Sequence, residues 1–80
     1  MKVEILAFGI AKEIVGAPYF HFEMEEGGTV NDLKDLLGKK FPELKALSSF
    51  RIAIDSEFAQ EEKPIQHHSE IAIIPPVSGG

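Results

Sequence analysis

The chain contains no cysteine. This absence excludes disulfide bonds, thiolate catalysis and metal sites built from cysteine ligands. Small secreted domains often depend on disulfides, so a cysteine-free chain of 80 residues suits a reducing compartment better. Apolar residues make up 44% of the chain and charged residues 26%, which predicts one folded domain rather than a disordered segment.

Long apolar runs are absent as well. No stretch approaches the roughly 20 consecutive apolar residues that a membrane-spanning helix requires. The apolar run after Lys2 is interrupted by Glu4, Lys12 and Glu13, so it lacks the apolar core of a secretory signal peptide. These features predict a soluble, cytoplasmic protein with no membrane partner.

Positive charge is scarce, since 8 basic residues stand against 13 acidic ones and the net charge is −5. A nucleic-acid-binding protein needs a basic stripe to displace counterions from phosphates. The densest charge runs here, within 23–26 and 57–62, are acidic. Nucleic acid is therefore not an expected partner, and a partner with a basic surface is favoured. A merely solvated acidic surface is the alternative for each run.

Apolar residues alternate in four segments with the period of a β-strand. In the first strand Leu6 and Phe8 make the second face apolar too, which predicts a strand covered on both sides. The first two strands are predicted to pair antiparallel. The predicted strands span residues 2–9, 19–24, 50–55 and 71–74, and the intervening segments 11–18, 42–49 and 56–70 are predicted as loops or turns. Phe58 and Ile65 are the expected packing points of the last loop.

One segment has the period of an amphipathic helix. Thr29 can cap its first turn, and Asp32 follows three residues later, in the spacing of a capping box. Pro42 is expected to end the helix near Lys40. The apolar stripe of the helix consists of Val30, Leu33, Leu36, Leu37 and Phe41.

The order β-β-α-β-β predicts an α+β domain, in which a mixed sheet packs on one main helix. The last strand is so apolar that it is expected to lie inside the sheet, paired with the first. The predicted domain covers residues 1–74, and residues 75–80 form a flexible C-terminal tail that ends in diglycine.

No self-contained catalytic group is apparent among the side chains. His67 and His68 are adjacent, so on a strand they would point to opposite faces, and His21 has no histidine at a ligand spacing. The serines lack a G-x-S-x-G context, and the glycine-rich phosphate-binding patterns are absent. No metal site and no bound cofactor are expected.

The ending "IIPPVSGG" is the one candidate for chemistry. Pro75 and Pro76 remove two amide donors, so the sheet stops there. Gly79 and Gly80 have no side chains, so the tail can enter a narrow tunnel. The terminal carboxylate is a poor electrophile until it is activated, for instance as a mixed anhydride with AMP, and it can then accept sulfur or an amine. A frayed chain end is the alternative.

Three stretches resemble the ubiquitin-like β-grasp sulfur carriers, the family that includes the small subunits of molybdopterin synthase. They are "VEILAFGIAKEIVG", "TVNDLKDLL" and, most specifically, the ending "EIAIIPPVSGG". The element order and the long loop before the last strand are similar as well. The resemblance implies a β-grasp fold over essentially the whole chain.

The resemblance also implies a reaction cycle. A ubiquitin-activating-like adenylyltransferase would use ATP to adenylate the carboxylate of Gly80, and a sulfur donor protein would convert it to a thiocarboxylate. The tail would then enter the large subunit of molybdopterin synthase, which builds the dithiolene of molybdopterin from cyclic pyranopterin monophosphate. The catalytic side chains would belong to that subunit, in a heterotetramer of two small and two large subunits.

Roles for the tail come from the same resemblance. Gly80 would carry sulfur and Gly79 would allow passage, while Val77 and Ser78 would line the tunnel mouth. Pro75 and Pro76 would direct the tail. Phe8 and Ile65 are candidate interface residues.

The sequence departs from the family pattern at two turns. "DSE" (55–57) replaces an Asn-Gly-like turn, and "HHSE" (67–70) replaces a Gly-Asp pair, so a residue other than glycine is expected in a strained turn. Three alternatives remain open: a sulfur carrier for the thiazole of thiamin, a protein modifier conjugated through Gly80, and a β-grasp binding module with an idle tail.

Overall fold

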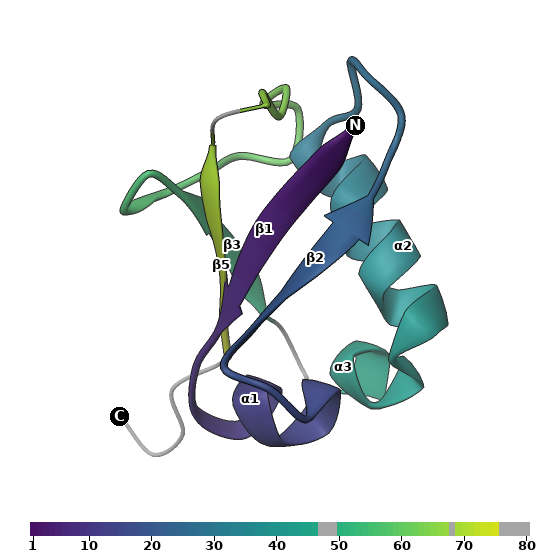
Figure 1. Ribbon diagram of the computed structural model, residues 1–80, viewed down its shortest axis with the longest axis vertical. Helices are drawn as coiled ribbons and strands as arrows, with labels where there is room; N and C mark the ends of the chain where they lie inside the picture. The colour runs from purple at the N-terminus through teal and green to yellow at the C-terminus, as the bar shows by residue number, and fades with distance from the viewer. Residues whose placement is uncertain (47–49, 68, 76–80) are drawn as a thin grey trace.

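The computed structural model describes residues 1–46, 50–67 and 69–75. Within these ranges eight elements follow one another, three of them helices (Figure 1). They are β1 (Lys2–Ala7), α1 (Gly9–Val15), β2 (Tyr19–Glu23), α2 (Val30–Lys40), α3 (Pro42–Ala46), β3 (Arg51–Ile54), β4 (Glu57–Phe58) and β5 (Glu70–Ile74).

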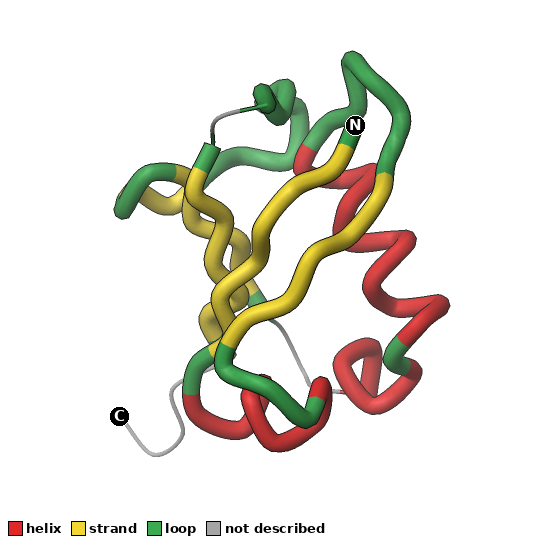
Figure 2. Tube along the Cα trace, in the orientation of Figure 1, coloured by secondary structure: helices red, strands yellow, loops and turns green. Residues whose placement is uncertain are grey.

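The strands form one mixed sheet in the order β2-β1-β5-β3-β4. β1 pairs antiparallel with β2 and parallel with β5, and β5 pairs antiparallel with β3. The predicted pairings of the first strand with the second and with the last are thus confirmed. Figure 2 shows the helices beside the sheet and at one of its ends. The predicted α+β class, with a mixed sheet packed on one main helix, is confirmed.

The core lies between the sheet and α2. Alternate residues of the three central strands are buried, and Val30, Leu33 and Leu37 of α2 meet them from the other side. The strand residues of this core are Val3, Ile5, Ala7, Ile52, Ile54, Ile71 and Ile73. Because side chains alternate along a strand, the residues between them face away from the core. One sheet face is therefore packed and the other is open.

Helix α2 begins as its sequence predicts. The Thr29 N–H donates to Oδ2 of Asp32 at 3.0 Å, and the Asp32 N–H donates to Oγ1 of Thr29 at 3.3 Å. This reciprocal pair is the predicted capping box, and it satisfies two amides that the first turn leaves without helical partners. The helix ends at Lys40, as predicted. Among the described residues, no helix is long and apolar enough to cross a bilayer.

Two predicted loops are wrong, because each contains a short helix. In α1 the supposed breaker Gly16 is the C-cap: its φ is 84°, and its N–H donates to the carbonyl of Lys12 at 2.9 Å. In α3 Pro42 stands at the first position, where a missing N–H costs the helix nothing. Leu44 then anchors α3 as a fully buried residue. Residues 47–49 of that predicted loop lie outside the described residues.

The predicted loop over 56–70 contains the short strand β4, which forms a hairpin with β3. Its two turn residues, Asp55 and Ser56, have φ values of 51° and 72°. A two-residue hairpin turn of this kind requires positive φ, a region that favours glycine. The expectation of a non-glycine residue in a strained turn is confirmed here. His68, in the second departure, lies outside the described residues.

Candidate functional site

The root of the tail lies at the centre of the sheet. β5 is flanked by β1 and β3, so Ile73 pairs with Ala7 on one side and with Ile52 on the other. Pro75 comes directly after β5 and has no N–H to extend either ladder. The other predicted tail residues, Pro76, Val77, Ser78, Gly79 and Gly80, lie outside the described residues, so their roles remain predictions. The hydrogen-bond ladders of β5 with β1 and with β3 therefore fix the position of the root of the tail.

Beside this root, the open sheet face carries a transverse row of residues in register. Each of the five strands contributes one side chain to it. In the order of the strands the row reads Tyr19, Leu6, Ala72, Ala53 and Phe58. The two central residues are alanines and the outer ones are large, so the middle of the face is hollowed.

The hollow is a depression of about 230 Å³, which we call the sheet-face groove. Six apolar residues line it, with Ser56 and Glu70 beside them. The apolar lining consists of Leu6, Phe8, Ala53, Phe58, Ala72 and Ile74. Because Ile74 immediately precedes Pro75, the groove and the root of the tail adjoin.

Two aromatic rings of the groove are half exposed: Phe8 at 50% and Phe58 at 55%. The guanidinium carbon of Arg51 lies 3.9 Å from the centroid of the Phe58 ring, a cation–π contact that orients the ring at the rim. Covering apolar surface releases roughly 25 cal/mol per Å², so these rings favour contact with a partner. The groove is suited to docking rather than to chemistry.

Charge is distributed unevenly around the groove. Glu4 pairs with Glu70 in the register of β1 and β5, two residues before the pair of Leu6 and Ala72. Asp55 extends this acidic side, because its Oδ1 accepts the N–H of Glu70 at 2.9 Å. Arg51 lies at the other end, opposite Ile74 in the register of β3 and β5. A partner with basic groups facing the carboxylates would therefore dock in one orientation.

Phe8 and Ile65, the two residues predicted at an interface, lie in different environments in the structure. Phe8 lines the groove, so its predicted role stays open to test. Ile65 is only 3% exposed, and its N–H donates to the carbonyl of Gly28 at 2.9 Å. The prediction of Ile65 as an interface residue is wrong because its side chain is part of the core. Its alternative role as a packing point of the loop is confirmed.

Phe58 was predicted to pack inward and instead lies at the rim of the groove. The short strand β4 pairs Phe58 with Ala53, whose side chain faces away from α2, and so directs the ring outward. The signal that could have revealed the groove was the apolar second face of the first strand, Leu6 and Phe8. Both faces of the first strand were predicted to be covered. Among the described residues the second face is left open, and Phe8 is half exposed.

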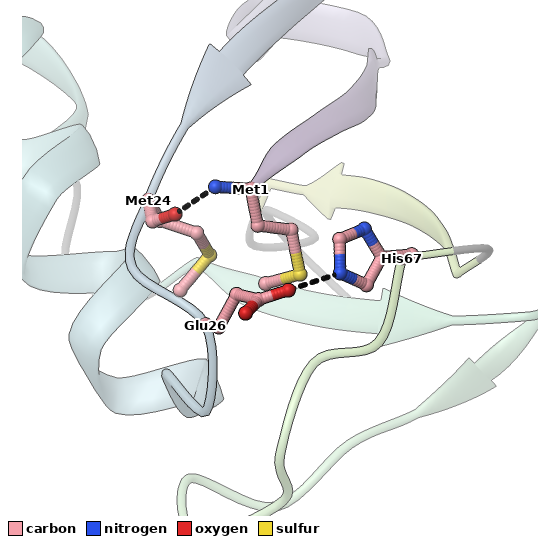
Figure 3. Close-up of polar contacts among 4 residues, drawn as sticks. All are labelled: Met1, Met24, Glu26 and His67. Atoms are coloured by element: carbon pink, nitrogen blue, oxygen red, sulfur yellow. Dashed lines mark hydrogen bonds and ion pairs between the residues drawn. The ribbon is translucent and has the colours of Figure 1, made fainter.

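His67 is hydrogen-bonded to a carboxylate from a distant part of the chain. His67 donates from Nε2 to Oε1 of Glu26 at 2.6 Å, and the Met1 ammonium donates to the carbonyl of Met24 at 2.8 Å (Figure 3). The hydrogen bond from His67, together with its positive charge when protonated, holds the pKa of Glu26 below its usual range. Both side chains of this pair are exposed. The described residues contain no group of three or more potential metal ligands.

The comparison with known families decides the family. A model of the ThiS family matches residues 5–80, which include both the groove and the tail. The chain belongs to the ThiS family. An Arabidopsis thaliana relative named molybdopterin synthase sulfur carrier subunit is 36% identical, over 100% of this chain and 84% of the relative. The predicted family resemblance is thus confirmed.

Solved structures are similar over nearly the whole ThiS-family chain. The small archaeal modifier protein 1 of Methanosarcina acetivorans is 26% identical with a TM-score of 0.79, covering 99% of this chain and 96% of the other. A Helicobacter pylori complex of subunits 1 and 2 of molybdopterin-converting factor contains a chain that is 23% identical with a TM-score of 0.68, covering 100% of both chains. The fold is the predicted ubiquitin-like β-grasp.

Proposed function

We propose that this chain is the sulfur carrier of a molybdopterin synthase and carries sulfur on the carboxylate of Gly80. One observation carries the proposal. The strand that leads to the tail is the central strand of the sheet, and it ends beside an exposed apolar groove. A partner that covers the groove would receive the tail at its own surface.

The proposed cycle begins when an adenylyltransferase activates the carboxylate. A carboxylate oxygen attacks the α-phosphorus of ATP and pyrophosphate leaves, which gives an acyl-adenylate. Sulfur at the oxidation level of sulfide, delivered by a donor protein, then attacks the carbonyl carbon as HS⁻; AMP leaves, the proton is lost to solvent, and a thiocarboxylate results without a redox step. In the large subunit the sulfur passes to cyclic pyranopterin monophosphate, and water restores the carboxylate. The cytoplasm is the compartment that we propose, because activation consumes ATP.

The large subunit is the partner that we propose for the sheet-face groove. The Helicobacter pylori neighbour is named as a complex of two subunits, which supports a two-subunit assembly, and we propose a heterotetramer. Glu4 and Glu70 beside the groove, together with the net charge of −5, favour a basic partner surface. Catalytic groups would come from that partner.

The test is an intact-mass measurement. The native-ended chain is incubated with its activating enzyme, ATP and a sulfide source, and its mass is expected to rise by the difference between sulfur and oxygen. Two controls are the chain lacking Gly80 and the chain with one residue added after Gly80; neither should gain sulfur, and both should melt at the wild-type temperature. An unchanged wild-type mass would contradict the proposal, as would sulfur gained without Gly80.

A protein modifier is the second candidate, because the Methanosarcina acetivorans neighbour, at 26% identity, is named as a modifier. Both functions require the activated carboxylate, but only a modifier forms amide bonds to lysines of other proteins. Slower-migrating conjugates that depend on Gly80 in a cell extract would favour this candidate. Co-purification with a large synthase subunit, rather than with a thiazole synthase, would favour the molybdopterin pathway over the thiamin pathway.

A further inference from the structure

We infer that Gly9 is a positioning residue for the tail, because it leaves the space in which Pro75 packs and thereby sets the direction in which the chain leaves β5. The inference rests on the proposed function, since it concerns the same tail. Gly9 lies outside the sheet-face groove, and neither the sequence pattern nor the proposed chemistry assigned it a role.

The contact arises from the parallel pairing of β1 with β5. Ala7 and Ile73 are register partners, so Gly9 and Pro75 each lie two residues beyond the last pair, at the same end of the sheet (Figure 1). A β-carbon built on Gly9 would lie 3.3 Å from Cγ of Pro75. Carbon atoms pack best at about 3.5–4.0 Å, so even a methyl group would push the proline ring.

Backbone conformation alone does not explain this glycine. Gly9 has a φ of 55°, which the turn from β1 into α1 requires and which disfavours a side chain. Gly16 and Gly27 have φ values of 84° and 83°, yet a β-carbon at either would meet no further atom of the described residues within 4 Å. Gly9 therefore differs from them in its neighbour, and that neighbour is the root of the tail.

A small shift of Pro75 matters because the reactive tail begins at this residue. The ring restricts φ of Pro75, so the residue cannot absorb a push by rotating freely. Five residues separate Pro75 from the reactive end, a reach of up to roughly 17 Å for an extended chain. A change of direction at the root therefore shifts the range of positions that the carboxylate can reach, and a misplacement of about 1 Å at the reacting group can slow a reaction strongly.

The test compares Gly9→Ala with Gly16→Ala. Both substitutions place a β-carbon at positive φ, but only Gly9→Ala places it against Pro75. Melting temperatures first establish that both variants are folded and comparably destabilised. Gly9→Ala is expected to lower kcat of thiocarboxylate formation about tenfold with little change in KM, because only the placement of the reactive carboxylate changes. Gly16→Ala is expected to stay within about twofold of wild type. In a Pro75→Ala background, which removes the ring atom that is contacted, Gly9→Ala should have a much smaller effect.

Equal kinetics for the two folded alanine variants would overturn the inference, and so would an undiminished effect of Gly9→Ala in the Pro75→Ala background. A second readout does not depend on sulfur transfer. In NMR spectra of the isolated chain, the amide signals of residues 77–80 should move in Gly9→Ala and stay in place in Gly16→Ala. If wild type forms no thiocarboxylate, the proposed function fails. The spectra still decide whether Gly9 positions the tail, because signals that are unmoved in both variants would refute that inference.

Discussion

The exposed ring of Phe58 is suited to contact with a partner protein. The ring is 55% exposed at the rim of the sheet-face groove, and Arg51 stacks on it. An exposed ring adds little to the stability of the isolated chain, but it can bury most of its area under a second protein. Aromatic residues of this kind commonly dominate binding energy at interfaces.

We predict that Phe58→Ala weakens binding to the large synthase subunit by about 10- to 30-fold, the range of a modest hot spot. Its free energy of unfolding should fall by only about 1 kcal/mol or less, mainly through the lost contact with Arg51. Titration calorimetry and urea denaturation measure the two quantities. Tyr19→Ala is the matched control, because Tyr19 is equally exposed in the same row but does not line the groove. Equal losses of affinity in the two variants would contradict a docking role for the groove.

At the scale of elements, the β3–β4 hairpin carries Phe58 to the rim. The hairpin depends on a turn in which Asp55 and Ser56 have positive φ. Two hydrogen bonds to Glu70 offset the backbone strain at Asp55. The Asp55 N–H donates to the carbonyl of Glu70 at 2.8 Å, and the Asp55 side chain accepts the Glu70 N–H. No described side-chain hydrogen bond of Ser56 offsets its strain in the same way, so strain is concentrated at Ser56.

Ser56→Gly is therefore expected to raise the free energy of unfolding by about 0.5–1 kcal/mol, because relief of backbone strain exceeds the added entropy of the unfolded chain. Urea denaturation followed by circular dichroism measures the change. Ser56→Ala separates strain from the hydroxyl: it keeps the β-carbon at positive φ and should give no gain. A stabilised alanine variant, or a destabilised glycine variant, would show that the turn is not strained.

At the scale of the whole molecule, contacts distant in sequence hold the end of the fold opposite the tail root. His67 joins the loop before β5 to Glu26 in the loop before α2, and the Met1 ammonium is bound to Met24 nearby (Figure 3). The His67–Glu26 pair is exposed and the contact between Met1 and Met24 is partly buried, and each involves an ionisable group. The stability of this end should therefore depend on pH.

The pKa of Glu26 is lowered in the folded chain, chiefly by the hydrogen bond from His67. A lowered pKa means that ionised Glu26 stabilises the fold above the ordinary glutamate pKa, and that this contribution is lost as the pH falls through the lowered value. We predict that wild type is slightly more stable than Glu26→Gln at about pH 6 and that the difference shrinks as the pH falls below the ordinary glutamate pKa. Denaturation at a series of pH values measures it, with Glu25→Gln as the control. A difference that grows on acidification would have the wrong sign.

Much of the fold was predictable because its causes are local. Strand alternation, the capping box at Thr29 and the helix end at Lys40 each depend on residues within a few positions. The helices α1 and α3 were missed because Gly16 and Pro42 were interpreted as breakers, although glycine can end a helix and proline can begin one. Phe58 and Ile65 were both expected to pack, and only Ile65 does, because the composition of a loop does not reveal which side chain turns into the core.

The sequence by itself determined that the chain folds as a β-grasp domain of the ThiS family, and it made the terminal carboxylate the candidate for chemistry. Only the tertiary structure decided which surface adjoins the root of the tail. The row from Tyr19 to Phe58 and the contact of Gly9 with Pro75 join residues that are far apart in the chain. Such contacts depend on strand order and register, which are set by the packing of the whole core and not by any local pattern.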